Sequence, residues 1–196
     1  MVHKKNASVQ SVIADTRYWL KSTVIHYNLC PFANQVFSCG RVHFEVSDAT
    51  TVERLLEDFL LAINDLLATP REQTETSLLI HPYVLEDFSE YNEFLGMVDE
   101  LIIGAELTGV VQVASFHPQY CFAETDKEDA ANFTNRSPYP MLHILREVSV
   151  SEAIDEWQER SLDIEQVPVR NIETLRKLGT EILASQLLTC YREGYE

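Results

Sequence analysis

Apolar residues follow a helical period through the N-terminal part of the chain. Trp19, Val24 and Tyr27 fall on one face, and the pattern predicts a helix over residues 8–27. A polar segment with one proline separates this helix from residues 41–46, in which polar and apolar residues alternate. Alternation of this kind is typical of a half-buried strand.

The middle of the chain changes repeatedly between helical and strand-like patterns. Helical spacing predicts helices over residues 51–67 and 89–107, each closed by a nearby proline or glycine. A short continuous apolar run predicts a strand at residues 77–80, and residues 110–114 are the third strand candidate. Residues 116–138 are polar and irregular, and a structured loop of that length is often functional.

Helices dominate the pattern after this loop. We expect them over residues 139–147, 151–159 and 171–191, with a short edge strand at residues 164–169. Pro140 suits the first turn of the first of these helices, because its missing N–H costs nothing there.

This order of elements favours an α/β fold in one domain spanning residues 1–196, with residues 1–10 flexible. Strands joined by helices are usually parallel, so we expect a three-layer architecture: a small, mostly parallel sheet flanked by helices, with a helical C-terminal extension. A ferredoxin-like α+β arrangement is the alternative, because the pattern does not give strand direction.

Charge and composition exclude several classes of function. The 196 residues include 15 lysines and arginines against 31 aspartates and glutamates, a formal net charge of −16. No basic stripe is present to neutralise phosphates, which argues against nucleic-acid binding. The sequence shows no apolar run long enough for a membrane span and no signal peptide. Its four cysteines form no C-x-x-C pair, so we expect a cytoplasmic protein. The oligomeric state stays open.

Two histidines lie where open parallel sheets bind their ligands, beyond the carboxyl ends of the strands. His81 and His117 each follow a predicted strand and precede a proline, which keeps the histidine backbone out of the helical region. Histidine acts as a general acid or base near neutral pH, or as a metal ligand. A hydrogen-bonded core or loop histidine is the alternative reading.

A second candidate set lies around the helix predicted after the long loop. His143, Arg146 and Glu147 would share one helical face. There Glu147 could orient the imidazole or help it bind a divalent metal, and Arg146 could hold a carboxylate or phosphate. Asn135 and Arg136, just before the helix, point to a small anionic ligand or to a nearby aspartate. An intrahelical salt bridge with a capping network is the alternative.

Cys30 is the third candidate. If Pro31 opens a helix, the amide dipoles at its N-terminus would stabilise a Cys30 thiolate. The sequence Cys-Pro-Phe-Ala resembles the active-site turn of omega-class glutathione transferases. Those proteins place the cysteine after a strand, whereas a helical pattern precedes it here. A buried structural cysteine is the alternative.

Three motifs together resemble a known family. They are Leu-Cys-Pro-Phe-Ala at 29–33, Ala-Ser-Phe-His-Pro at 114–118, and Thr-Asn-Arg-Ser-Pro-Tyr-Pro-Met-Leu-His-Ile-Leu-Arg-Glu at 134–147. The resemblance is to an uncharacterised, mainly bacterial domain-of-unknown-function family and covers about residues 15–185. It implies a single cytosolic domain with these motifs as its hallmark, and it implies no reaction or cofactor.

Three hypotheses follow from these residues. The first is a small-molecule enzyme that uses His117 and His143 as acid/base groups or divalent-metal ligands, with Arg136 and Arg146 binding an anionic substrate. The second is a non-catalytic domain that binds a ligand or partner, in which the longest motif is a rigid packing and capping unit. The third is thiol redox chemistry at Cys30.

Overall fold

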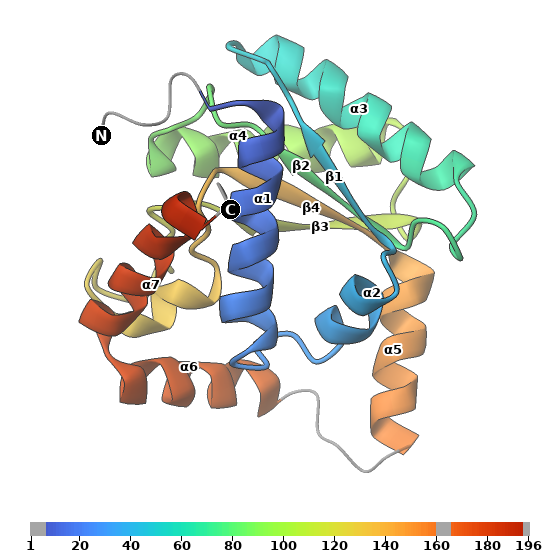
Figure 1. The fold of residues 1–196 in the computed structure, drawn as a ribbon. Coiled ribbons are helices and arrows are strands. Elements are labelled where there is room, and N and C mark those ends of the chain that lie inside the picture. The colour runs from blue at the N-terminus through green and yellow to red at the C-terminus, as the bar shows by residue number, and fades with distance from the viewer. Residues whose placement is uncertain (1–6, 160–165, 194–196) are drawn as a thin grey trace.

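A four-stranded sheet forms the centre of the protein (Figure 1). The computed structural model describes residues 7–159 and 166–193. The strands lie in the order β1-β2-β4-β3. Their bounds are Val42–Val46 for β1, Thr76–Ile80 for β2, Val111–Phe116 for β3 and Met141–Arg146 for β4.

Three of the four strands run in the same direction. β1 pairs with β2 in parallel, and β4 is antiparallel to both β2 and β3. Ile80 and Phe116, the last residues of β2 and β3, both pair with Met141 at the start of β4. The carboxyl ends of β2 and β3 therefore lie on either side of the β4 N-terminus.

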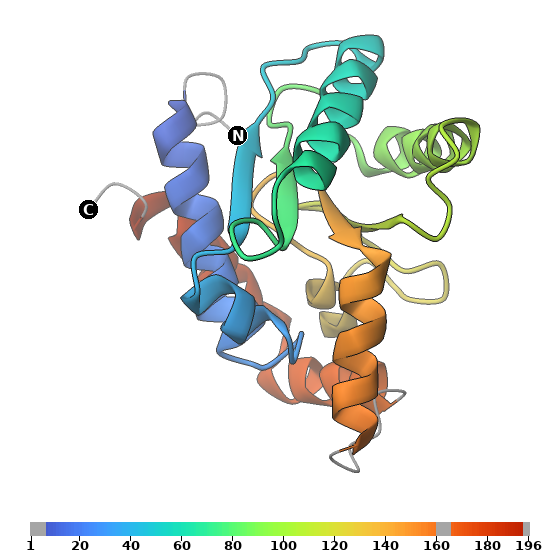
Figure 2. The same ribbon diagram turned by 90° about the vertical axis from the view of Figure 1, so that its right-hand side faces the viewer.

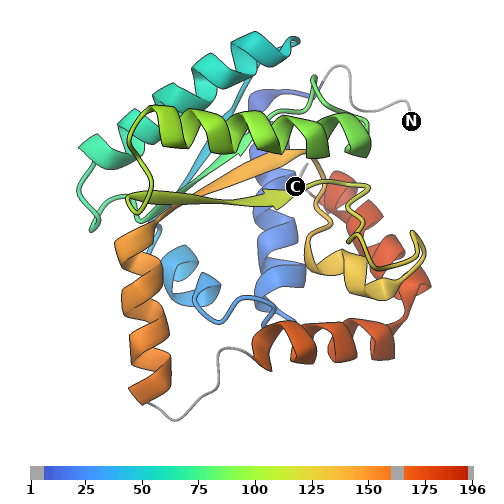
Figure 3. The ribbon, with the colours of Figure 1, turned by 180° about the vertical axis from the view of Figure 1, so that it is seen from behind.

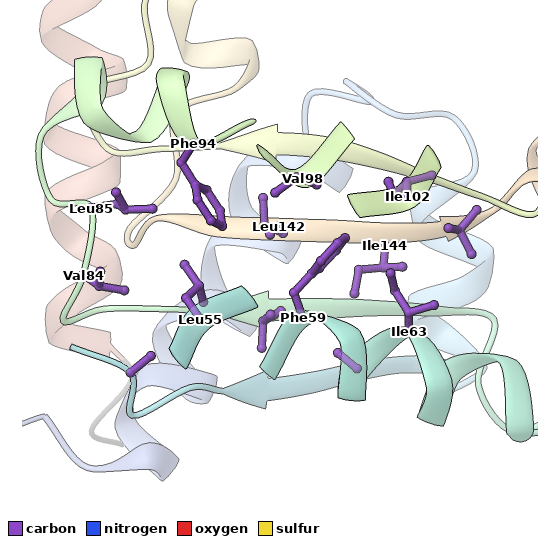
Figure 4. Packing of buried hydrophobic residues seen from close by; sticks show 14 of the residues in the cluster. Leu55, Phe59, Ile63, Val84, Leu85, Phe94, Val98, Ile102, Leu142 and Ile144 are labelled. Atoms are coloured by element: carbon purple, nitrogen blue, oxygen red, sulfur yellow. The ribbon is translucent and has the colours of Figure 1, made fainter. Parts of the chain in front are cut away.

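One face of the sheet is covered by α3 (Val52–Ala68) and α4 (Phe88–Gly104), which lie over the strands in Figure 3. The side chains of Thr51 and Asp87 accept hydrogen bonds from backbone N–H groups in the first turns of these helices. Phe59, Phe94 and Ile144 belong to the apolar core between the helices and the sheet (Figure 4).

The other face is covered by the N- and C-terminal helices (Figures 1 and 2). Trp19 and Met141 belong to the buried core on this side. The elements on this side are α1 (Val9–Trp19), the π-helical turn η1 (Leu20–Ile25), the short α2 (Ala33–Ser38), α6 (Gln166–Leu178) and α7 (Thr180–Glu193). The three-layer α/β prediction is confirmed, but the sheet is mixed: β1 and β2 pair in parallel, whereas both pairings of β4 are antiparallel. The ferredoxin-like alternative is wrong, because helices separate β1 from β2 and β2 from β3.

The region predicted as a helix over residues 139–147 is strand β4, so that prediction is wrong. Leu142 and Ile144 pack toward α3 and α4, while Met141 packs toward α1. A strand buried on both faces is a nearly continuous apolar run, which periodicity does not separate from a short helix. Hydrogen bonding to β2 on one side and to β3 on the other decides the outcome.

The C-terminal part is helical, with different bounds from those predicted. α5 (Glu147–Glu159) follows β4 directly, and the helix expected at 171–191 is α6 and α7, separated at Gly179 with a φ of 85°. Of the edge strand predicted at 164–169, residues 164 and 165 lie outside the described residues, and the rest begin α6. Among the helices that the structure describes, none is long and apolar enough to cross a membrane.

Candidate functional site

His81 and His117 lie one residue beyond the ends of β2 and β3, and the structure brings them together around Tyr91 of α4. All three side chains are fully buried. The His81 ring stacks on Tyr91 with 5.8 Å between the ring centroids, and the His117 ring lies 5.1 Å from Tyr91. Phe88 of α4 closes the cluster against His117.

Both imidazoles hold the loop that joins β2 to α4, residues 81–87, which we call the β2–α4 loop. His81 Nδ1 lies 3.1 Å from the Val84 carbonyl oxygen, so that nitrogen carries the proton and donates. Gln119 N–H donates to His117 Nδ1 over 3.0 Å, so the His117 proton is on Nε2 and is donated to the Leu85 carbonyl, 3.2 Å away. The two bonds fix consecutive carbonyls of one loop.

The environment keeps His81 neutral. Burial, together with a smaller effect of the nearby His117, lowers the pKa of His81 to about 4. The Nε2 atom of His81 is buried and has no hydrogen-bond partner. His81 is therefore an uncharged imidazole at neutral pH, with one unused acceptor atom.

Tyr91 links the histidines to the sheet, and the sequence reading missed it. Its hydroxyl donates to the Met141 carbonyl over 2.9 Å and accepts from Phe116 N–H over 3.1 Å. One side chain on α4 thereby satisfies backbone groups where β3 and β4 meet. In the sequence Tyr91 is one more apolar position at helical spacing, and nothing there separates it from ordinary core residues.

A surface pocket of about 510 Å³, largely open to solvent, lies against the β2–α4 loop, near the carboxyl ends of β1 and β2. It is lined by residues 50–52 at the start of α3, by residues 83–87 of the loop and by Glu90 of α4. Val84 and Leu85, whose carbonyls accept from the two histidines, therefore also line the pocket. Figure 4 shows their side chains at one end of the core, near Leu55 of α3 and Phe94 of α4.

His143 lies on the opposite face of the sheet from His117. Its neighbours Leu142 and Ile144 pack under α3 and α4, so alternation along β4 turns His143 toward the α1 side. Its Nε2 donates over 2.7 Å to the Thr76 hydroxyl, which donates to the Ile144 carbonyl. Burial lowers the pKa of His143 to about 4.

The structure therefore does not bring His117 and His143 together as an acid/base pair or as ligands of one metal. Their side chains are separated by the sheet itself. Within residues 7–159 and 166–193, no group of three or more His, Cys, Asp and Glu side chains could hold a metal ion. The geometry gives each histidine its own hydrogen-bonding role instead.

Arg146 points from β4 to the end of α3. Its Nη2 donates to the carbonyls of Leu66, Thr69 (2.7 Å) and Thr74 (3.3 Å). A cation at the C-terminus of a helix also interacts favourably with the helix dipole. These three carbonyls engage Nη2 of the guanidinium group that the sequence assigned to an anionic ligand, while its buried Nε has no hydrogen-bond partner.

Glu147 does not share a helical face with His143 and Arg146, because His143 and Arg146 belong to strand β4. Glu147 is the first residue of α5, and its N–H donates to the Val110 carbonyl. Glu147 lies four positions after His143 in the chain. At about 3.3 Å per residue in a strand, the backbones of the two residues are about 13 Å apart. The proposed Glu–His pair is therefore absent.

Arg136 and Asn135 fasten the loop between β3 and β4, residues 117–140, which we call the β3–β4 loop. Arg136 Nε donates to the Tyr120 carbonyl over 3.1 Å and its Nη2 to the Lys127 carbonyl over 2.6 Å. Asn135 Nδ2 donates to the Ser115 carbonyl over 3.0 Å. Both side chains that were expected to bind an anion are thus engaged with the main chain.

Asn132 is the buried centre of the β3–β4 loop. Its Oδ1 accepts from Phe122 N–H (3.0 Å) and from the Thr125 hydroxyl (2.7 Å), while its Nδ2 donates to the Asp126 carbonyl (2.8 Å). This side chain closes residues 122–132 of the loop on themselves, and Arg176 of α6 pairs with Asp129 from outside the loop. Only the unusual length of the loop hinted at such a residue.

Comparison with known families identifies the family to which the chain belongs. Residues 11–185 match the family model described as Protein of unknown function (DUF1415). The chain belongs to this family. No curated protein and no solved structure matches it significantly.

In this DUF1415 protein the motif around Cys30 does not have the expected geometry. α2 begins at Ala33, two residues later than expected, and Phe32 occupies its N-cap position. Burial raises the pKa of the Cys30 thiol, and hydrogen bonds from Phe32 and Ala33 N–H offset this only in part. The environment therefore favours a neutral thiol over the thiolate that redox chemistry needs.

Proposed function

We propose that this DUF1415 protein binds a small polar molecule in the pocket beside the β2–α4 loop. In this proposal the long motif supplies the rigid framework around the site, as the non-catalytic hypothesis requires. The observation that carries the proposal is the position of the pocket. It lies near the carboxyl ends of the parallel strands β1 and β2, where open α/β sheets bind their ligands.

The charges around the pocket favour a neutral or cationic ligand. Glu86, Asp87 and Glu90 line it, and the Asp87 carboxylate also caps α4. The two arginines that the sequence offered for an anion, Arg136 and Arg146, donate to main-chain carbonyls. An amine or a hydroxyl-rich ligand would be better matched to this lining than a phosphate or carboxylate.

A thermal-shift experiment with matched probes tests the proposal. The panel contains the diamine putrescine, the triamine spermidine and the polyol sorbitol, with succinate and citrate as anionic counterparts. We expect a cationic or neutral probe to raise the melting temperature of the wild-type protein. At a hundredfold excess over its Kd, a bound probe adds about 2.7 kcal/mol to the free energy of unfolding. The anions should have no such effect.

Two variants show whether a hit occupies the pocket. Glu90→Gln removes a lining carboxylate, whereas Glu93→Gln removes an exposed carboxylate of α4 that does not line the pocket. A probe bound in the pocket should lose its effect in Glu90→Gln and keep it in Glu93→Gln. Equal stabilisation of both variants, or stabilisation by the anions alone, would contradict the proposal.

A catalytic role is the second candidate function, and one observation favours it. His81 Nε2 is an unprotonated, buried imidazole nitrogen without a partner, which is the state that a general base needs. Under this candidate a substrate turned over by the wild-type protein would be left unchanged by His81→Asn. His117, His143, Glu147 and Cys30 would act as framework residues under both candidates.

A further inference from the structure

We propose that His81 and His117 form a proton-sensitive latch on the β2–α4 loop: the neutral imidazoles hold the loop closed, and protonation releases it. The consequence for ligand binding rests on the function proposed above, because the same loop lines the pocket. The latch itself is a property of the protein without ligand.

The geometry of the closed state depends on both rings. They come from the ends of two different strands, yet they bond the carbonyls of two consecutive residues, Val84 and Leu85. Leu85 has a φ of 58°, a left-handed conformation that is unfavourable for leucine and needs outside support. The side chains of Val84 and Leu85 pack in the core, and the two histidine bonds fix the backbone above them.

Protonation is incompatible with these contacts. His117 Nδ1 accepts from Gln119 N–H, and a proton on that nitrogen would set two donors against each other. A proton on His81 Nε2 would create a buried charged N–H with no acceptor. Each charge would also lie close to the other ring.

The rings that pack against His81 and His117 are aromatic side chains of neighbouring elements. The groups in ring contact are Tyr91 and Phe88 from α4, and Tyr120 of the β3–β4 loop packs on Phe88. Burial raises the pKa of Tyr91, so Tyr91 stays uncharged and gives an imidazolium no counter-ion. The nearby carboxylates, Glu86, Asp87 and Glu90, lie along the pocket. Burial therefore penalises an imidazolium at His81 in the closed state, and solvent stabilises it once the loop opens.

The direction of the pH response follows from these contacts. The pKa of buried His81 is about 4, below the ordinary value near 6.5 that an exposed histidine has in the open loop. Protons therefore bind the open state more strongly, and opening increases as the pH falls from 7 toward 4. Occupancy of the pocket should fall over the same range.

Hydrogen exchange of the ligand-free protein tests the latch. Protection is measured at pH 7 and pH 5 for peptides covering residues 82–90, β2 and β4, after correction for the intrinsic exchange rates. We expect the protection of residues 82–90 to drop more than tenfold, because a single histidine with these two pKa values shifts the opening equilibrium by about twentyfold. Peptides of β2 and β4 should keep their protection.

Conservative variants identify the titrating groups. The double variant His81→Asn with His117→Gln keeps an N–H donor near each carbonyl but cannot be protonated. The protection of residues 82–90 in this variant should therefore change less than twofold between pH 7 and pH 5. His143→Gln replaces the histidine on the opposite face of the sheet and should retain the wild-type response. If the double variant does not fold, His81→Asn alone should reduce the wild-type drop at least threefold.

Three results would overturn the latch. The first is unchanged protection of residues 82–90 in the wild-type protein between pH 7 and pH 5. The second is the same drop in protection in the variants of His81 and His117. The third is an equal loss of protection in β2 and β4, which would indicate global unfolding. A probe panel without hits beside an intact loop response would remove the proposed function and leave the latch. If a probe binds the pocket but the protection of the loop does not respond to pH, the latch is removed and the proposed function is retained.

Discussion

Replacing Arg146 with methionine is expected to lower the free energy of unfolding by about 2–4 kcal/mol. The side chain is 8% exposed and donates to three backbone carbonyls between Leu66 and Thr74. Methionine fills a similar volume but offers no donor, so the carbonyls at the end of α3 lose their partner in a buried position. Urea unfolding at neutral pH measures the difference.

Arg54→Met is the matched control. Arg54 lies in α3, but its side chain is half exposed and pairs with exposed Glu57 and with the buried Asp58, whose carboxylate also accepts from the Ser47 hydroxyl. Ion pairs of a half-exposed arginine contribute little to stability, so we expect the free energy of unfolding of this variant to lie within about 1 kcal/mol of the wild-type value. If both variants lost the same small amount, Arg146 would be free to bind an anionic ligand, as the sequence alone indicated.

The second large effect is the pH dependence of stability caused by His143. Its pKa is about 4 in the folded protein and about 6.5 when unfolded. The neutral ring therefore contributes stability that is complete above pH 6.5 and is lost as the pH falls toward 4. Between pH 7 and pH 4 this loss is on the order of 2–3 kcal/mol.

His143→Gln isolates that contribution. Glutamine keeps a donor for the Thr76 hydroxyl and does not titrate, so the variant should lose about 2–3 kcal/mol less than the wild-type protein between pH 7 and pH 4. His43→Gln, at an exposed position of β1, should follow the wild-type curve. Urea unfolding at unit pH steps gives both comparisons. Parallel curves for His143→Gln and the wild-type protein would show that His143 is accessible to protons in the folded state.

The sequence predicted the part of the fold that depends on local pattern. Alternating strands and helices up to residue 116 follow from periodicity, and the parallel direction of β1, β2 and β3 follows from the helices between them. That topology also places His81 and His117 at the strand ends. Strand β4 escaped prediction because Met141–Arg146 fits a helical and a strand pattern equally well, and only its pairing partners distinguish the two.

The candidate site was only partly predictable, because most of its hydrogen bonds connect residues far apart in the chain. Arg146 reaches back 80 residues to Leu66, and Tyr91 reaches forward 50 residues to Met141. The local sequence pattern around one residue gives no information about a partner so far away in the chain. The sequence therefore identified chemically active residue types but not whether their polar groups face a ligand or the main chain.

We infer that His81, His117 and His143 are all neutral, hydrogen-bonded imidazoles: the first two hold the loop beside the pocket, and the third lies on the opposite face of the sheet. Imidazole ¹⁵N chemical shifts at pH 7, assigned through His81→Asn, His117→Gln and His143→Gln, test it most directly. We expect one fixed tautomer for each ring: Nδ1–H for His81, and Nε2–H for His117 and His143. Imidazolium shifts, or averaging between the two tautomers at His117 or His143, would contradict the account.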